Sequence, residues 1–241
     1  MWWLLWSLWG TLPAHPAPET ASWLRLEARL QGVVCILEAG PRLEVLGDTL
    51  HAVARGDTLV VTLRHRVGTW LARWGWAPDT VVVRLPEALP AEIQVDHQGG
   101  LLVLRGQGLR IAALMLNLRH TRAFLTLEDT RALGPVVLRA FWSEIHLGPL
   151  PRRAPEYLHL QTNLCRVFLD LRTPPDRSVP VVLAAQFSDL RLYTDGAPVL
   201  ADRQGLLNLG PLPRSGSGPG YRLLVTGNLN RLRVFPNPKG R

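Results

Sequence analysis

Apolar and polar residues alternate along most of the chain, in short runs that end at glycine, proline or a pair of charged residues. The alternation is clearest over 24–30 (LRLEARL), where every second residue is leucine or alanine and the residues between them are charged. Successive side chains of a β-strand point to opposite faces of the sheet, so this period of two predicts a half-buried strand. The runs at 32–40, 41–47, 58–64 and 81–85 predict further strands.

The strand-like runs between Leu101 and Leu147 are regularly spaced. They begin near positions 101, 113, 123, 135 and 143, so the spacings are 12, 10, 12 and 8 residues. Short, evenly spaced strands are typical of a sandwich, a barrel or a solenoid. Because two consecutive spacings make a repeating unit of roughly 20 to 22 residues, we favour the solenoid, in which each coil stacks on its neighbours. We therefore predict an all-β fold, a single-stranded β-solenoid of many short strands with little helix.

Composition agrees with many short strands. The chain has 241 residues, 47% of them hydrophobic, and its 20 prolines and 21 glycines are spread along the whole length, where they interrupt long helices and mark turns. We expect three segments: an apolar segment and proline-rich spacer over 1–22, a first part of the solenoid over 23–147, and a second part over 148–241 that continues the first.

The N-terminal segment is rich in tryptophan, with Trp2, Trp3, Trp6 and Trp9 in an apolar run of about 12 residues that is too short to span a bilayer. It has three interpretations: a secretory signal, an interfacial membrane anchor, or a segment that packs on the body of the protein. The first predicts an exported protein, the second a membrane-associated one, and the third predicts neither location. A second tryptophan cluster, over 70–76, is expected to cap one end of the solenoid.

The net charge is +8, and arginine supplies nearly all of the positive charge. This balance favours anionic partners such as nucleic acid, lipid headgroups or acidic polymers, although it is also a compositional habit of some genomes. The arginines expected on an outer face that binds such partners are Arg119, Arg122, Arg139, Arg152 and Arg153.

The two cysteines, Cys35 and Cys165, both lie in apolar runs. We expect two buried free thiols, with a single disulfide between them as the alternative in an exported protein.

The phrase over 80–100 (TVVVRLPEALPAEIQVDHQGG) combines a valine strand, a short acidic turn between prolines, and a second strand that ends in a glycine pair. With the repeated short strands that follow, it resembles a family of bacterial adhesin-like domains of unknown function. The resemblance covers Trp23 to Leu147. It lies in the regular spacing of the strands and in the proline turn rather than in catalytic residues. It implies a right-handed β-solenoid at the cell envelope.

The segment after residue 156 resembles a different family, the C-terminal toast-rack domain of envelope stress proteins of the LiaF and phage-shock type. Three features carry the resemblance: Asp170-Leu171 at a strand end, Pro174-Pro175 in a turn, and Asp189-Leu190 in the following strand pair. Those proteins usually have several transmembrane helices before the domain, and this sequence has none.

One group of residues is a candidate for chemistry. In the runs SEIHL and EYLHLQ, the period of two turns Glu144, His146, Tyr157 and His159 outward. If the two strands are neighbours, Glu144, His146 and His159 can approach one another and bind a divalent metal; the other interpretation is an ordinary polar outer face. No nucleophile elbow, P-loop, zinc-protease or dinucleotide-binding motif is present.

The leading hypothesis is a non-enzymatic β-solenoid that acts as an interaction or scaffold module, adhesin-like and associated with the cell envelope. We expect no cofactor, and as partners another protein or further copies of the chain, with a membrane surface reached through the N-terminus. Two alternatives stay open: an arginine-rich surface that binds nucleic acid or another anionic polymer, and an enzyme with a surface His/Glu site. An exported or membrane-associated location is favoured over a cytoplasmic one.

Overall fold

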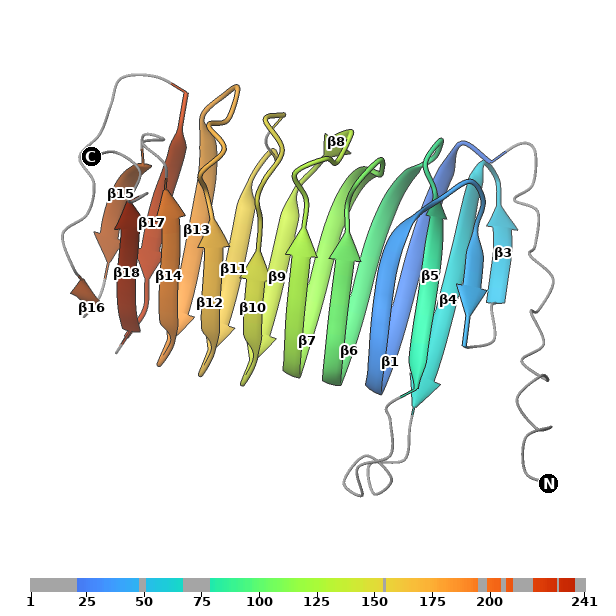
Figure 1. Cartoon of the computed structure of the whole chain (residues 1–241), viewed down its shortest axis with the longest axis horizontal. Helices are drawn as coiled ribbons and strands as arrows, with labels where there is room; N and C mark the ends of the chain where they lie inside the picture. Colours follow the sequence, from blue (N-terminus) through green and yellow to red (C-terminus); the bar gives the residue numbers. More distant parts are fainter. Residues whose placement is uncertain are drawn as a thin grey trace, which may run out of the picture.

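The computed structural model describes residues 21–47, 51–66, 79–153, 155–194, 199–204, 207–209, 219–228 and 230–236. Within these residues the fold is all-β, without helix, and its strands hydrogen-bond into one sheet that does not close on itself. The expected solenoid-like β fold is therefore confirmed. Figure 1 shows the coils lined up along the longest axis of the molecule.

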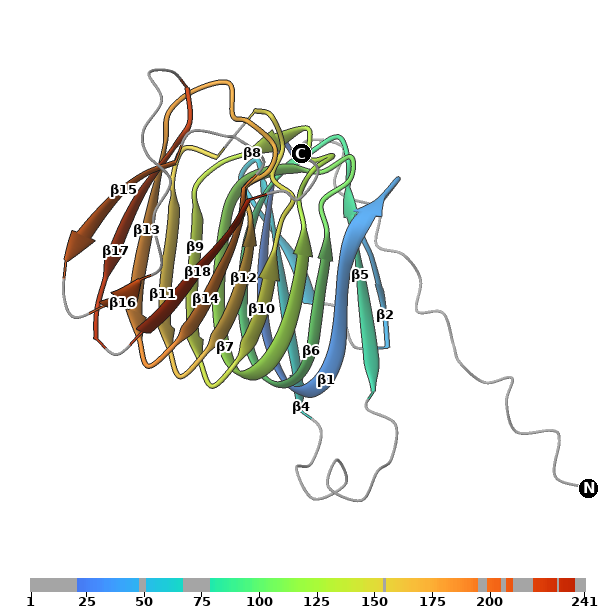
Figure 2. The same ribbon diagram turned by 60° about the vertical axis from the view of Figure 1, so that its left-hand side comes forward.

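Each coil is U-shaped, because the chain runs along one layer, bends, and returns along a second layer (Figure 2). Three long strands pass through the bend and contribute to both layers: β1 (Trp23–Gly40), β6 (Pro90–Arg105) and β7 (Arg110–Thr126). In later coils the bend separates two strands, such as β9 (Val136–Phe141) and β10 (Glu144–Leu147). The next coil repeats this path one strand spacing further along the axis, about 4.8 Å away.

The parallel strands thus form two layers. The first layer contains β4 (Thr58–Arg66), the first halves of the long strands, β9, β11 (Leu158–Asn163), β13 (Val179–Gln186), β17 (Tyr221–Thr226) and β15 (Val199–Gln204). The second layer contains β5 (Thr80–Pro86), the second halves of the long strands, β10, β12 (Arg166–Asp170), β14 (Asp189–Thr194), β18 (Asn230–Pro236) and β16 (Leu207–Leu209). A short strand, β8 (Ala132–Leu133), pairs with the start of β7.

The order of the coils departs from the order of the sequence at both ends. The β4/β5 coil stacks on the outer side of β1, while β6 stacks on its inner side. Likewise, the β17/β18 coil lies between β13/β14 and β15/β16. At the β4/β5 end, the antiparallel strands β2 (Glu44–Leu46) and β3 (His51–Arg55) pair with β5 and β4. These strands occupy the edge that unpaired parallel strands would otherwise expose.

The core lies between the two layers and consists of the inward-facing side chain at every second position. Leu26, Val61, Ile93, Leu116 and Leu160 are representative, and each is essentially inaccessible to solvent. The alternation of the sequence therefore does identify the buried positions. Because β10 pairs with β12, the stack runs through residue 148 without interruption.

Cys35 and Cys165 are both buried and free. Burial raises the pKa of the Cys35 thiol to about 12 and also raises the pKa of Cys165. The two thiols therefore behave as interior groups rather than as a cross-link.

Two expectations concern parts of the chain outside the described residues: the N-terminal segment with Trp2, Trp3, Trp6 and Trp9, and the tryptophan cap over 70–76. Among the described residues, no helix has the length and apolar content that crossing a membrane requires.

The bend makes different demands on two adjacent glycines, and this difference is testable. Gly99 and Gly100 both have positive φ, 71° and 95°. A Cβ at Gly99 would meet nothing closer than 3.9 Å, whereas a Cβ at Gly100 would lie 2.2 Å from the carbonyl oxygen of Val33 in the adjacent β1 coil. We predict that Gly99→Ala costs about 1–2 kcal/mol of backbone strain, whereas Gly100→Ala costs clearly more because the coils must separate. Urea unfolding of the two variants measures the difference, and equal losses would contradict the prediction.

Candidate functional site: the bend ridge and the adjoining groove

The backbone bends through a left-handed residue in each central coil. Gly32 and Gly99 occupy this position in the β1 and β6 coils, as expected for a positive φ. The next four coils place large side chains there: His120, Trp142, Leu164 and Phe187, with φ between 48° and 56°. For bulky residues this conformation is a genuine outlier.

The strand register aligns these four residues. Arg119 pairs with Phe141, Phe141 with Asn163, and Asn163 with Gln186, each immediately before the bend. The strands after the bend continue in the same register. The four bend residues therefore follow one line along the solenoid axis, which we call the bend ridge (His120, Trp142, Leu164 and Phe187).

The bend ridge is open to solvent, and three of its four residues are apolar. Trp142 is 56% exposed, Leu164 44% and Phe187 54%. At the end nearest β6, the ring of His120 lies edge-on to that of Trp142, with centroids 5.5 Å apart. Phe141, which precedes the bend, stacks beside Trp142 at 6.1 Å and is itself exposed. Large apolar side chains thus gather on a convex edge and not in the core.

A buried row of hydroxyl and thiol groups supports the bend ridge from inside. The residues that follow the four bend residues are Thr121, Ser143, Cys165 and Ser188. Each donates a hydrogen bond of 2.9–3.1 Å to the carbonyl two residues earlier, across the bend. The hydroxyls of Ser143 and Ser188 also accept the backbone N–H of Thr121 and Cys165 in the preceding coil. These bonds hold the bend in one conformation.

Sequence reasoning did not find this arrangement, although a signal for it is present. Thr121, Ser143, Cys165 and Ser188 are spaced by 22, 22 and 23 residues, and each follows a large residue that itself follows a polar or aromatic one. The spacing matches the length of one coil. Cys165 is accordingly a structural equivalent of serine and threonine in this row.

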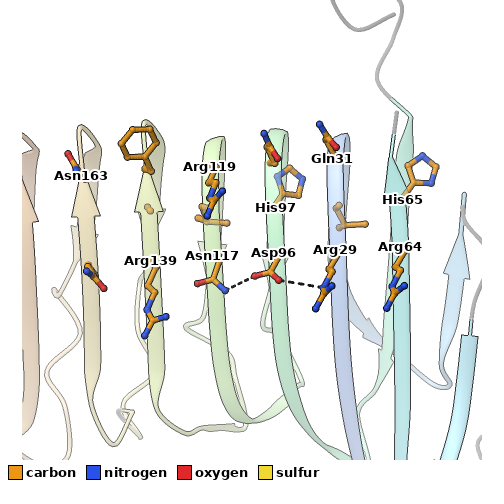
Figure 3. A pocket seen from close by; sticks show the side chains of 16 residues that line it. Arg29, Gln31, Arg64, His65, Asp96, His97, Asn117, Arg119, Arg139 and Asn163 are labelled. Carbon is orange, nitrogen blue, oxygen red and sulfur yellow. Dashed lines mark hydrogen bonds and ion pairs between the residues drawn. The ribbon is translucent and has the colours of Figure 1, made fainter. Parts of the chain in front are cut away.

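Beside the ridge, the outer face of the first layer has a shallow groove of about 910 Å³. Two rows of side chains, each running from coil to coil, line most of it. The outer row contains Arg64, Arg29, Asp96, Asn117, Arg139 and Gln161, and the row nearer the bend contains Gln31, Gln98, Arg119, Phe141 and Asn163. Figure 3 shows the labelled members of both rows side by side on successive strands.

Positive charge in the groove is only partly compensated. Asp96 accepts a hydrogen bond of 2.5 Å from Asn117 and lies 3.8 Å from Arg29 (Figure 3). The guanidinium groups of Arg64, Arg119 and Arg139 make no hydrogen bond or ion pair with any described residue. Four arginines against one aspartate leave the groove with a net charge of 4 − 1 = +3.

His97 lies beneath the groove and is only 2% exposed. Its Nδ1 is 3.0 Å from the Thr121 hydroxyl, and Nε2 has no hydrogen-bond partner at normal distance among the described residues. Burial lowers the pKa of His97 to about 4, an effect that the Val33 backbone only partly opposes. The imidazole is therefore neutral at physiological pH and belongs to the core.

The outer face of the second layer is paired internally. His146 stacks between Phe124 and Phe168, with ring centroids 4.6 and 4.2 Å apart, and Arg191 lies 5.1 Å over Phe168. The Nε2 atom of His146 is 2.9 Å from the Glu144 carboxylate, and this hydrogen bond lowers the pKa of the Glu144 carboxyl. Stacked rings and paired charges in adjacent strands stabilise a sheet, so this cluster has a structural explanation.

The three candidate metal ligands, Glu144, His146 and His159, do not lie together. Glu144 and His146 lie together on β10, but β10 pairs with β7 and β12 in the second layer. His159 lies on β11, which pairs with β9 and β13 in the first layer. The condition for that site, that the two strands are neighbours, is not met, because consecutive strands of a U-shaped coil lie in different layers. In the part of the chain that the structure describes, no three metal-ligating side chains form a group.

The five predicted arginines do not form one surface. Arg119 and Arg139 line the groove. Arg122 lies on the second layer, 3.7 Å from Glu144. Arg152 and Arg153 lie in the connection between β10 and β11, away from the bend. The structure adds Arg29 and Arg64, which sequence reasoning did not select.

No protein-family model and no curated protein matches the chain. One solved structure that is similar over 93% of this chain and 97% of its own is a "putative cell adhesion protein" from Clostridium sporogenes. The sequence identity is 9% and the TM-score is 0.41.

The buried His97 predicts a pH dependence of stability. Its folded-state pKa of about 4 lies below the ordinary 6.5, so the unfolded chain binds the proton more tightly. Stability is then lost as the pH falls from 6.5 towards 4. We expect His97→Gln to lose roughly 2–3 kcal/mol less than the native protein between pH 7 and pH 4.5, as measured by urea unfolding. The same pH dependence in both proteins would contradict this assignment.

Proposed function

We propose that the protein is a non-enzymatic interaction module of the cell envelope, adhesin-like in that it presents a rigid sheet surface, and that the bend ridge attaches it to a lipid surface. The observation that carries the proposal is the exposure of Trp142, Leu164 and Phe187 at positions where the backbone favours glycine. The β1 and β6 coils make the same bend with glycine.

These side chains are costly to the folded protein. A left-handed backbone costs a residue with a Cβ about 1–2 kcal/mol. The exposed parts of the side chains recover none of this by packing in the core. Strained backbone at a surface position is commonly found where function requires it. A contact outside the molecule accounts for large apolar residues on the bend ridge, whereas the requirements of folding do not.

A lipid surface suits the shape and chemistry of the ridge. The four residues form a convex line, which inserts readily into a soft interface but offers little enclosed area to a rigid protein surface. Tryptophan and other bulky apolar side chains favour the membrane boundary, and nearby cations are attracted to anionic headgroups. Arg119 and Arg139, which make no pair with a described residue, lie just before the bend on the first layer. Each cation near an anionic surface adds about 1 kcal/mol.

The N-terminal segment is a second element of the same proposal. Its four tryptophans lie outside the described residues, and as an interfacial anchor they would supply a separate attachment. A protein partner, including a second copy of the chain, is the competing occupant of the ridge. The vesicle experiment below separates these cases, because it changes the ridge and leaves the N-terminus intact.

The test is flotation of the full chain with phosphatidylcholine vesicles that contain 30% phosphatidylglycerol. We expect the variant Trp142→Gly, Leu164→Gly, Phe187→Gly to bind at least tenfold more weakly than the native chain. Because glycine relieves the strain, we expect its unfolding free energy to be unchanged or higher. The control variant Trp23→Ser, Tyr157→Ser removes exposed aromatic surface from outside the ridge and is expected to bind normally.

Native binding by the glycine variant would contradict the proposal and would assign any attachment to the N-terminal segment. A second result would also contradict it: no vesicle binding by the native chain, together with self-association in sedimentation velocity that the glycine variant abolishes. The ridge would then be an interface between two copies of the chain.

A further inference from the structure

We propose that the groove on the first layer binds a linear polysaccharide that carries carboxylate groups and runs along the solenoid axis. The proposal goes beyond the lipid contact and does not depend on it, since it rests on the outer face of the first layer and not on the ridge. The charge of the groove, the spacing of its arginines and its hydrogen-bonding side chains each favour such a ligand.

The first step is charge. Arg64, Arg119 and Arg139 make no ion pair with a described residue, and the groove carries a net charge of 4 − 1 = +3. The single carboxylate, Asp96, is held by Asn117 and Arg29, which reduces its repulsion of an incoming anion. Guanidinium groups bind carboxylates with two parallel hydrogen bonds, so a carboxylated ligand fits these arginines well.

The second step is spacing. Arg64, Arg29 and Arg139 occupy one register row on β4, β1 and β9. At about 4.8 Å per strand, Arg29 and Arg139 are three spacings apart, or about 14 Å. One strand spacing is close to the length of one sugar unit in an extended chain. A polysaccharide along the axis therefore presents successive units to successive coils, and its acidic groups meet the arginines at intervals.

The third step is recognition of hydroxyl groups. The groove contains four amide side chains besides Asn117: Gln31, Gln98, Gln161 and Asn163. Asn163 lines the groove, and its buried Oδ1 atom has no hydrogen-bond partner among the described residues. Amides both donate and accept hydrogen bonds, which suits a ligand rich in hydroxyls. The exposed ring of Phe141 offers a flat face to the C–H side of a sugar.

These features favour a sugar chain over single-stranded nucleic acid. Proteins that bind single strands stack successive bases on several aromatic side chains. Phe141 is the one aromatic side chain in the two rows that line the groove, whereas five side chains of these rows carry an amide. Nucleic acid therefore enters the experiment as a competing outcome.

The experiment measures binding of the full chain to an oligogalacturonate of eight units by isothermal titration calorimetry in 50 mM NaCl. We expect the variant Arg119→Gln, Arg139→Gln to lose at least tenfold in affinity. The matched control, Arg152→Gln, Arg153→Gln, removes the same charge from the connection between β10 and β11 and is expected to change affinity less than threefold. The Asn163→Ala variant is expected to weaken binding without changing the charge.

Three results would overturn the proposal: no binding by the native chain, equal losses in the groove variant and its control, or tighter binding of a single-stranded octanucleotide that the groove variant abolishes. The glycine variant of the bend ridge separates this proposal from the lipid contact. It keeps every charged and amide side chain of the groove, so we expect it to bind the oligogalacturonate normally even where it no longer binds vesicles.

Discussion

Every feature of this molecule depends on in-register hydrogen bonding between U-shaped coils. A single coil has an apolar inner face and no partner for its backbone groups, so it cannot fold alone, and its neighbours supply both. Register then converts each position of the coil into a row along the axis. Leu116, for example, lies in one buried row with Val95 and Leu138. The same rule creates rows of arginine, of stacked rings and of exposed bend residues on the outside.

The bend restricts the backbone conformation more than any other described part of the coil. Two layers can face each other only if the chain turns sharply, and a left-handed residue makes that turn. Glycine satisfies the backbone in the β1 and β6 coils, while the row from Thr121 to Ser188 holds larger residues in the same conformation in the next four coils. The hydrogen bonds across the bend therefore offset part of the backbone strain that a side chain causes at this position. They also hold that side chain in place for contact with another molecule.

The sequence predicted the parts of the fold that repeat locally. The alternation over 24–30 identified Leu26 and Leu30 as buried, and the spacing of the runs matched a coil of about 22 residues. It did not predict which strands are neighbours. His146 and His159 are 13 residues apart, but a solenoid pairs residues one whole coil apart, so they lie in different layers. The reversed order at the ends, such as β4 on the outer side of β1, depends on long-range pairing that no local pattern encodes.

The candidate surfaces were harder to predict than the core. Trp142, Leu164 and Phe187 are apolar residues in a left-handed conformation that their own propensity disfavours, so a pattern of hydrophobicity alone assigns them to the interior. Arg119 and Arg139 were selected from charge alone, together with three arginines that lie elsewhere. Charge identifies candidates, but only register shows which of them share a row.

Charge is compensated in most places on the outer faces but only partly in the groove. On the first layer, Arg25 pairs with Glu92 at 2.8 Å, and Arg29 lies 3.8 Å from Asp96. On the second layer, Arg84 bridges Glu38 and Glu44, and Arg122 lies against Glu144, so neighbouring coils compensate one another. In the groove of the first layer, by contrast, the side chains of Arg119 and Arg139 are exposed and make no ion pair with a described carboxylate. A paired arginine lowers the energy of the solenoid by itself, whereas an unpaired one lowers it only when an anion binds. The net charge of +8 is therefore informative less for its size than for the place of its unpaired arginines: Arg119 and Arg139 lie beside the bend ridge, where Trp142, Leu164 and Phe187 are exposed.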